Sequence, residues 1–294
     1  MRHSVIAWDH TESGVKSLTM TWAGLLAAAK QAKAAGDEQA EGKRLGKANA
    51  ITDALNETVD ETVAWFERTA LFTRTGHHGN GGDGAYRDGR GVAGAKFLQH
   101  TNRNGDPQLH VQTVLFNTVQ RADGADDEYR TVYSRAMKRA RLGMGAVATR
   151  VLARKLALLD LPLVHRVDDN GFEVGGVRED TMDAFSSRRV TVTEQLAEWK
   201  AEFLKSERRE PTRLELWAMR QKITTDTREP KSKEDLKPGE LLEQWEDRAV
   251  RAGVQPLPSI PADVEAFAQS HGSIAPVSTE ALHGPPTAPA TRPA

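Results

Sequence analysis

The sequence predicts an α+β fold in which helices pack on one side of an antiparallel sheet and the C-terminal part is helical. Two strand-like runs, Val92–His100 and Leu109–Thr118, flank a segment dense in turn residues, and this pattern predicts an antiparallel hairpin. Apolar residues recur at helical spacing between Tyr133 and Leu159 and again in segments after Thr193. The chain has 294 residues, of which 38% are apolar, so it can bury a real core.

The first ninety residues are predicted to hold one strand, two helices and a loop. Ser4–Asp9 is strand-like, and Ala23–Ala35 is rich in helix formers before glycines such as Gly42 interrupt the pattern. Asn49–Thr69 repeats apolar residues every three or four positions, which is typical of an amphipathic helix. Seven glycines and few apolar residues occupy 76–91, so we expect a mobile loop without a regular element there.

The second half is predicted to hold one long helix, a small hairpin and three shorter helices. The long helix, Tyr133–Leu159, is expected to kink or break near Gly143 and Gly145, because glycine disfavours helical backbone. An Asp-Asn-Gly turn precedes the second strand of the small hairpin. Its strands are Leu163–His165 and Phe172–Val174, and the three shorter helices are Thr193–Arg208, Leu214–Lys222 and Gly239–Ala252.

The composition divides the chain into three parts. We expect one domain over 1–250, a linker with a short helix over 251–271 and a disordered proline-rich tail over 272–294. Eight of the thirteen prolines follow Gly253, and few apolar residues follow Phe267, so the tail cannot bury enough surface to fold alone.

Charge and cysteine content narrow the class of protein. Forty basic and forty-one acidic residues leave a formal charge of -1, which excludes a uniformly basic coat for nucleic acid. The absence of cysteine excludes a disulfide scaffold, a thiolate metal site and a cysteine nucleophile. No apolar run approaches the roughly 20 residues that span a bilayer, and the sequence predicts a soluble, cytoplasmic protein.

The predicted hairpin brings together three potential metal ligands. His110 and Gln112 project to one side of their strand, and an antiparallel partner strand can bring His100 to that side. Asp9, at the end of the first strand, could lie in an adjacent strand and hydrogen-bond a ligand imidazole. Spacing alone favours the simpler interpretation, in which isolated histidines are structural and Gln112 is an ordinary polar residue on a half-exposed strand.

The residues around these histidines change that weighting. His100-Thr-Asn-Arg103-Asn-Gly-Asp-Pro-Gln-Leu-His110-Val-Gln112, followed by Asn117, resembles the metal-site hairpin of conjugative relaxases of the TrwC/TraI type, the MobF family. Further blocks resemble the family in the same order along the chain, and the resemblance spans about residues 4–249. These blocks are Asp9 with Ser13-Gly-Val-Lys-Ser17, Arg74-Thr-Gly76, Gly171-Phe-Glu-Val174 with Gly176-Val177, Phe185-Ser-Ser-Arg188-Arg189, and Thr227-Arg228 with Lys231.

The resemblance implies a nicking and strand-transfer domain of the HUH endonuclease class, which acts on single-stranded DNA at a plasmid origin of transfer during conjugation. It implies a palm-like sheet, a helical part that closes over DNA, and three histidines that hold a divalent metal ion, Mg, Mn or Zn, against the scissile phosphate. Here the third histidine is replaced by Gln112, so the implied metal ligands are His100, His110 and Gln112, with Asp9 supporting them. An amide oxygen is a weaker donor than imidazole for transition metals.

The family's nucleophile is a tyrosine that lies ahead of the block containing Asp9. Tyr86, Tyr129 and Tyr133 are the tyrosines of this chain, and none occupies that position. We therefore expect either a fragment or a decayed enzyme, inactive as it stands. The alternative is a non-catalytic accessory module that binds single-stranded DNA, and a third hypothesis is a metal-dependent hydrolase with a water nucleophile. Other relaxosome proteins are further expected partners, and no membrane is.

A local basic segment supports DNA binding. Arg130–Lys155 contains eight basic residues and no acidic one, which would attract the phosphates of a single strand. A solvated helix face is the alternative interpretation of such a segment, and a helix-end salt bridge is the alternative for Arg188 and Arg189. The candidate DNA-binding residues are Arg103, Arg135, Lys138, Arg139, Arg141, Arg188 and Arg189.

Overall fold

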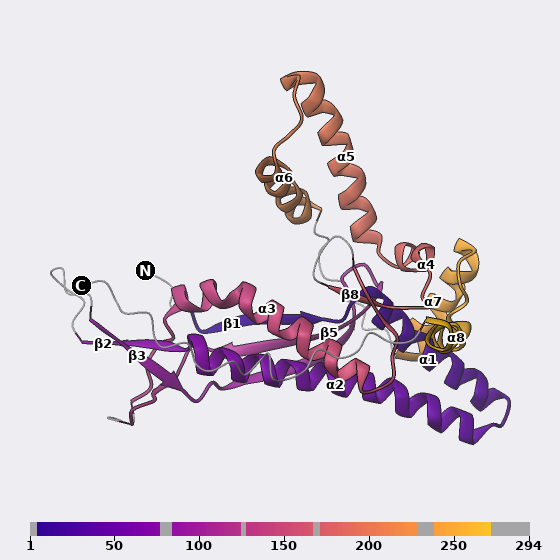
Figure 1. Ribbon diagram of the computed structural model, residues 1–294, viewed down its shortest axis with the longest axis horizontal. Helices are drawn as coiled ribbons and strands as arrows, with labels where there is room; N and C mark the ends of the chain where they lie inside the picture. Colours follow the sequence, from indigo (N-terminus) through magenta and orange to yellow (C-terminus); the bar gives the residue numbers. More distant parts are fainter. Residues whose placement is uncertain (1–4, 77–83, 125–127, 167–170, 228–237, 272–294) are drawn as a thin grey trace.

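The computed structural model describes residues 5–76, 84–124, 128–166, 171–227 and 238–271 (Figure 1). The strands of these ranges are β1 (Ala7–Ser13), β2 (Phe72–Thr75), β3 (Ala85–Arg90), β4 (Gly94–Thr101), β5 (Pro107–Phe116), β6 (Gln120–Arg121), β7 (Leu163–His165) and β8 (Phe172–Val174). The helices are α1 (Lys16–Ala34), α2 (Glu38–Ala70), α3 (Ser134–Ala157), α4 (Glu179–Ala184), α5 (Ser187–Glu207), α6 (Arg213–Asp226), α7 (Pro238–Ala252), the 3-10 turn η1 (Leu257–Ser259) and α8 (Ile260–His271). The predicted α+β class is confirmed.

The main sheet is antiparallel and has the strand order β1-β5-β4. Along β5, residues alternate between a buried face, which includes Leu109 and Val111, and a half-exposed face, which includes His110 and Gln112. Because side chains alternate along a strand, the buried residues fix which face carries the polar ones. The predicted hairpin is therefore present as β4 and β5.

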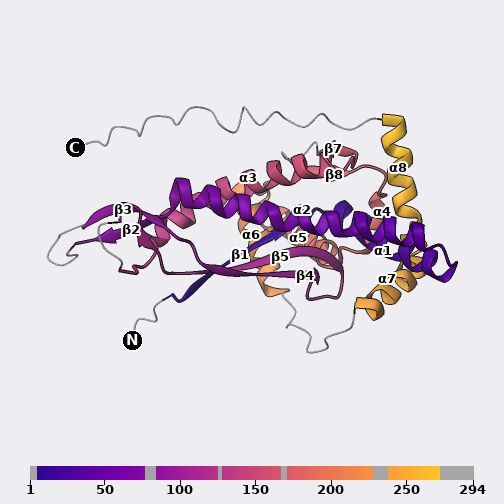
Figure 2. The same cartoon turned by 90° about the horizontal axis from the view of Figure 1, so that it is seen from below.

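Helices α1 and α2 pack on this sheet and α3 packs on α2, and Figure 2 shows α2 and α3 on one side of the sheet. Leu18, Ile51 and Leu152 come from the three helices and join Leu109 and Val111 in one buried cluster. This burial is what holds the amphipathic helices on the sheet.

Three glycines expected to disturb helices, Gly42, Gly143 and Gly145, lie inside continuous ones. At Gly143 an added Cβ would lie 2.7 Å from the ring of Trp65, so the missing side chain lets α3 approach α2 closely. Gly42 lies in the first turns of α2, which starts at the cap residue Asp37 rather than near Asn49. A glycine costs about 1 kcal/mol in a helix, and the packing of α2 against α1 and α3 offsets this.

The glycine-rich segment contains a strand that the sequence did not predict. β3 pairs with β2 on one side and with β6 on the other, and Gly89 donates its backbone N–H to the Leu71 carbonyl. Pairing on both sides satisfies the backbone and overrides the low strand propensity of glycine. Residues 77–83, with His77 and His78, lie outside the described residues. This second sheet sits over a separate small core of Phe66, Leu71, Val119, Val132, Ala140 and Met144.

The first strand also differs from its prediction. The sequence predicts a strand over Ser4–Asp9, whereas β1 spans Ala7–Ser13. Backbone pairing with β5 continues to Ser13↔His110, past the turn-like residues at 11–14. Tertiary pairing thus decides where this strand ends.

The C-terminal part is mostly helical, as expected. The small hairpin pairs β7 with β8, and α5 and α6 project from the body as a helical arm (Figure 1). In the two helices of this arm, only Val192 of α5 and Ile223 of α6 are buried.

The expected linker over 251–271 is instead packed against the body. Leu257, Ile260 and Val264 are buried in the main core, and both η1 and α8 contact α1. The apolar residues at these positions supply enough burial to fix the segment despite its prolines. The tail over 272–294 lies outside the described residues.

None of the helices in the described ranges is both long and apolar enough to cross a membrane.

Candidate metal and DNA-binding site

The two histidines lie on β4 and β5, close to the turn that joins them. Gln99 pairs with His110, whereas Thr101 pairs with Pro107, so a bulge shifts the register between them. Pro107 belongs to the buried face, and the residue next to Thr101 therefore points to the opposite face. The bulge thus places His100 on the half-exposed face that carries His110.

Each imidazole is held by a contact within the protein. His110 Nδ1 lies 2.9 Å from the Gln108 carbonyl oxygen, which requires an N–H at Nδ1 and leaves Nε2 as the acceptor. The His100 ring stacks on Trp22 with 5.0 Å between centroids and 3° between planes. Burial lowers the pKa of His100, and the neighbouring His110 lowers it further.

Gln112 lies on the predicted face and Asp9 in the adjacent strand, but Asp9 bonds to Gln112 and not to an imidazole. Gln112 donates from Nε2 to Asp9 Oδ2 at 3.0 Å, and its Oε1 accepts from Gln99 Nε2 at 3.1 Å. The expected bond is from Asp9 to an imidazole, but Asp9 lies opposite Val114, next to the Thr11–Gln112 pair and further from His110. The register therefore gives Asp9 the glutamine as its partner.

The residues fit a divalent cation that is bound by two imidazoles. The third ligand available is an amide oxygen, which binds more weakly. Among the described residues no group of three His, Cys, Asp or Glu side chains could hold a metal ion. The Gln112 oxygen lies on the same face, and it is already engaged by Gln99. His100 and His110 would hold the ion, and Gln112 would have to rotate to join them.

The turn between the two strands is held by a buried carboxylate that the sequence did not single out. Asp106 is fully buried and accepts hydrogen bonds from Arg248 Nη1 (2.8 Å) and from Ser187 N (3.0 Å) and Oγ (2.8 Å). Asn102 Nδ2 donates to it as well, at 3.0 Å. Charge-assisted bonds of this kind are stronger than neutral ones. The available sequence signal was the presence of both Asp106 and Ser187 in family-like blocks; nothing marked Arg248.

Two further side chains hold the same turn. Trp245 donates from Nε1 to the Gly105 carbonyl at 2.9 Å and packs edge-on against Trp22, the residue that stacks on His100. Lys16 donates from Nζ to the carbonyls of Pro107 (2.7 Å) and Phe185 (2.8 Å). Burial lowers the pKa of Lys16 to about 8, although the Asp106 charge opposes this shift. We call β4, β5 and their turn, with these contacts, the histidine hairpin.

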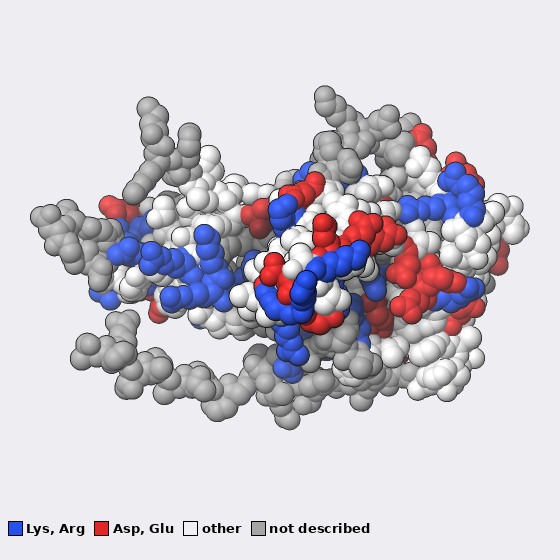
Figure 3. Space-filling view, turned by 90° about the horizontal axis from the view of Figure 1, so that it is seen from above, with Lys and Arg blue, Asp and Glu red and all other residues white. Residues whose placement is uncertain are grey.

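A second region, which we call the basic end, comprises β2, β3, β6 and the N-terminal half of α3. Figure 3 shows basic side chains gathered at this end of the molecule. The exposed cations of α3 have no ion pair with any described residue: Arg135, Lys138, Arg139 and Arg141. Exposed cations without an ion pair form the electrostatic surface that a phosphate backbone requires.

The other predicted DNA-binding arginines have contacts inside the protein. Arg103 is exposed at the tip of the hairpin turn and has a partner within the described chain. Arg188 donates to the Thr224 carbonyl and so joins α5 to α6, and Arg189 lies 3.9 Å from Asp183. Their contacts favour the structural alternative for Arg188 and Arg189.

The three tyrosines lie away from the histidine hairpin in the topology. Tyr86 is in β3 of the second sheet, Tyr133 caps the start of α3, and Tyr129 lies shortly before it and is 72% exposed. The Tyr86 and Tyr133 rings are 4.8 Å apart, and the Tyr86 hydroxyl donates to Tyr133 at 3.4 Å. This hydrogen bond, with the nearby Arg135 and Arg139 charges, lowers the pKa of Tyr133.

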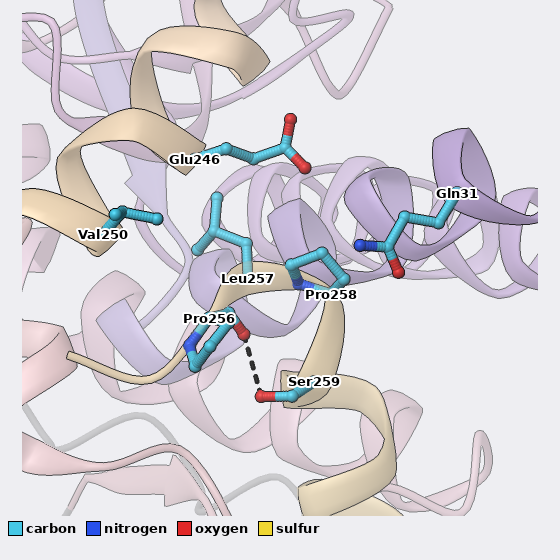
Figure 4. Close-up of a pocket in the computed structure, with 7 residues that line it drawn as sticks. All are labelled: Gln31, Glu246, Val250, Pro256, Leu257, Pro258 and Ser259. Atoms are coloured by element: carbon cyan, nitrogen blue, oxygen red, sulfur yellow. Dashed lines mark hydrogen bonds between the residues drawn. The ribbon is translucent and has the colours of Figure 1, made fainter. Parts of the chain in front are cut away.

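A hollow of about 410 Å³ between α1, α7 and η1 offers no comparable chemistry (Figure 4). Its lining is mostly apolar, with Leu257, Val250 and two prolines. Its carboxylate, Glu246, already forms an ion pair with Lys30 at 2.9 Å.

The comparisons with known proteins agree with this geometry. A protein-family model described as TrwC relaxase matches residues 2–252. A search of curated proteins found no match.

Solved structures of the conjugative relaxase TrwC are similar in fold. A copper-bound complex with oriT DNA has a TM-score of 0.60 and 24% identity, and covers 85% of this chain and 72% of that one. A metal-bound complex with oriT DNA has a TM-score of 0.59 and 25% identity, and the match covers 85% of this chain and 73% of that one. A complex with mutant oriT DNA has a TM-score of 0.61 and 24% identity, and the match covers 85% of this chain and 75% of that one.

Proposed function

The chain belongs to the TrwC relaxase family, and we propose that it binds single-stranded DNA at a plasmid origin of transfer. The observation that carries the proposal is that the basic end and the histidine hairpin occur together in one fold. The basic end presents Arg135, Lys138 and Arg139, none of which has an ion pair with a described residue, and the histidine hairpin presents two imidazoles on one sheet face. Structures of TrwC itself contain oriT DNA, with and without metal. Plasmid DNA is cytoplasmic, so the proposal places the protein there, with other relaxosome proteins as partners.

The proposed path of the DNA follows the charges. Phosphates would lie along α3, because each cation that neutralises a phosphate releases a counterion and strengthens binding. The helical arm of α5 and α6 extends from the body and exposes Leu214 and Trp217. We infer that it closes over the strand and offers Trp217 as a stacking surface for bases.

At the histidine hairpin, the residues of this chain would orient a scissile phosphate. A bound divalent cation would polarise the phosphoryl oxygens. His110 keeps Nε2 available because the Gln108 carbonyl fixes its Nδ1 proton, and stacking on Trp22 holds the His100 ring in place. Asp9 holds Gln112 on the same face through its amide.

We further propose that this chain alone does not form a covalent bond to DNA. The family's reaction requires a tyrosine beside the metal site, and Tyr86 and Tyr133 are instead in contact with each other beside the second sheet. Tyr129 lies in the same part of the chain, shortly before α3.

A non-catalytic accessory module remains the second candidate, and the engaged oxygen of Gln112 favours it. The two candidates differ in metal dependence. A relaxase-type site would bind Mn²⁺ or Zn²⁺ through His100, whereas an accessory module would bind DNA equally well with His100→Ala and with metal removed.

The test is a binding assay with a labelled origin-of-transfer oligonucleotide and Mg²⁺ or Mn²⁺. We expect binding that weakens with salt and no protein-linked DNA after denaturation. Replacing Arg135, Lys138 and Arg139 by Gln should reduce the slope of log affinity against log salt by about 2, at roughly 0.7 per single-strand phosphate contact. The control replaces Lys30 and Lys47, which pair with Glu246 and Glu265, and should leave the slope unchanged. No binding would contradict the proposal, and a covalent product would contradict the expected inactivity.

A further inference from the structure

The basic end contains a hollow with aromatic walls that the metal site does not use. Its volume is about 640 Å³, within the roughly 300–1,000 Å³ typical of small-ligand pockets. It lies between the end of α2, the start of β2, β3 and the first turns of α3. The lining residues are Trp65, Thr69, Ala70, Phe72, Tyr86, Tyr133, Ala136, Arg139 and Ala140.

The aromatic rings of the hollow are held in fixed positions. Tyr86 and Tyr133 lie 4.8 Å apart at 55° between planes, and the Arg74 guanidinium lies 5.4 Å from the centre of the Tyr86 ring. Tyr86 is nevertheless 41% exposed, so part of its surface is open to a ligand. The wall therefore offers a preorganised π surface, which reduces the entropy lost on binding.

Positive charge surrounds this aromatic wall. Arg139 lines the hollow itself and has no ion pair with the described residues. Arg135 and Lys138 are exposed on the same turns of α3, and Figure 3 shows basic side chains gathered at this end. An anionic group attached to a flat aromatic ring would match this combination, whereas a neutral apolar ligand would leave the cations unused.

We infer that this hollow receives one unstacked base of single-stranded DNA, with a neighbouring phosphate at Arg139. The inference deepens the proposed function and rests on it. A base in a single strand can leave its neighbours and stack on aromatic side chains, whereas a paired base in a duplex cannot reach such a wall. Phosphate contacts position a strand but do not distinguish one nucleotide from another. A pocket that holds one base would fix which nucleotide of the strand lies at the basic end.

The first experiment changes the DNA and not the protein. A fluorescent 2-aminopurine is placed at successive positions of the labelled origin-of-transfer strand, with full-length protein in excess. We expect one position to change its fluorescence strongly on binding, because that base leaves its neighbours for the tyrosine wall. Removing this base to leave an abasic site should weaken binding about tenfold, as expected for the loss of one stacked base.

The second experiment links that base to the pocket. Tyr86→Leu should also weaken binding about tenfold, Tyr86→Phe should keep the ring and bind normally, and Tyr129→Leu is the matched control for an exposed tyrosine outside the hollow. On the abasic strand, Tyr86→Leu should have no further effect, because a pair that interacts gives non-additive losses. Normal unfolding curves for Tyr86→Leu exclude a folding defect.

The outcomes separate this inference from the proposed function. If the wild-type protein does not bind the strand, both fail. If it binds with the expected salt dependence but Tyr86→Leu and the abasic strand bind normally, or if their losses add, the pocket inference is overturned and the proposed function stands. A free deoxynucleoside monophosphate that binds as tightly as the strand would also overturn it, in favour of a nucleotide site.

Discussion

The histidine hairpin and the basic end differ in what their charged side chains contact. In the hairpin, Asp106, Arg248 and Lys16 all bond to other groups of the protein. At the basic end, Arg135, Lys138 and Arg139 have no ion pair with the described residues. Polar groups that satisfy one another fix a geometry, whereas exposed cations without an ion pair remain available to an anionic ligand. The first region is built to hold side chains in place and the second to attract an anion.

The largest expected effect of any single change is that of Asp106→Ala. The change leaves Arg248 and Ser187 without their acceptor, and breaking such a buried pair typically costs about 3–5 kcal/mol. Urea unfolding gives the loss directly. The matched control is Asp60→Ala, which removes a 63% exposed carboxylate paired with Lys96 and should cost about 1 kcal/mol or less. Equal losses for the two variants would show that the turn is not held as described.

Lys16 provides a test of the same turn through pH. Its pKa is about 8 in the folded protein against an ordinary value of 10.5, so between these pH values the unfolded chain binds more protons than the folded one. The free energy of unfolding therefore increases as pH rises from 8 to 10.5, because the folded protein no longer holds a buried charge on Lys16. This increase is lost again as pH falls through 8. We expect the difference between wild type and Lys16→Met to grow in favour of wild type by about 3 kcal/mol from pH 7.5 to pH 10.5. Parallel curves for the two proteins would contradict the buried position of the amine.

A smaller effect is expected from Gln112→His, which asks whether the hairpin's rigidity serves a metal ion. A third imidazole on the same face should tighten Zn²⁺ or Mn²⁺ binding about tenfold or more, because nitrogen donors suit these ions better than an amide oxygen. The new ring also loses the bond to Gln99 and leaves Asp9 free to accept its second N–H. Calorimetric titration measures both affinities.

The control for this variant is His100→Ala in the Gln112→His background, which should remove the gain. Equal affinities for wild type and Gln112→His, unaffected by His100→Ala, would mean that the hairpin's histidines are structural.

The sequence predicted the parts of the site that depend on local pattern. Strand alternation gave the common face of His110 and Gln112, and the family-like hairpin gave its partner strand. The sequence could not predict the bond between Asp9 and Gln112. This bond depends on the register of β1 against β5, which are about a hundred residues apart in the chain. Arg248 was missed for the same reason: its carboxylate partner is 142 residues away in sequence.

The fold was likewise predicted where periodicity is strong and missed where pairing or packing decides. Helix α3 was expected, but its path through Gly143 depends on the ring of Trp65 in another helix. Strand β3 was missed because its glycines predict a loop, whereas β2 and β6 supply the hydrogen bonds that stabilise it. The buried position of Leu257 was missed because prolines on both sides suggested a linker.

The smallest expected effect on stability completes the comparison, and it belongs to the basic end. Replacing Arg135, Lys138 and Arg139 together by Gln should change the free energy of unfolding by no more than about 0.5 kcal/mol, because exposed side chains without an ion pair contribute little. Less repulsion among like charges on α3 could even raise it slightly. The same variant should lose DNA affinity, so stability and binding separate in one protein. Urea unfolding and the salt-dependent binding assay on the same preparation measure both. If unfolding became easier by more than 1 kcal/mol, these cations would be part of the protein's own packing, and the contrast with the histidine hairpin would fail.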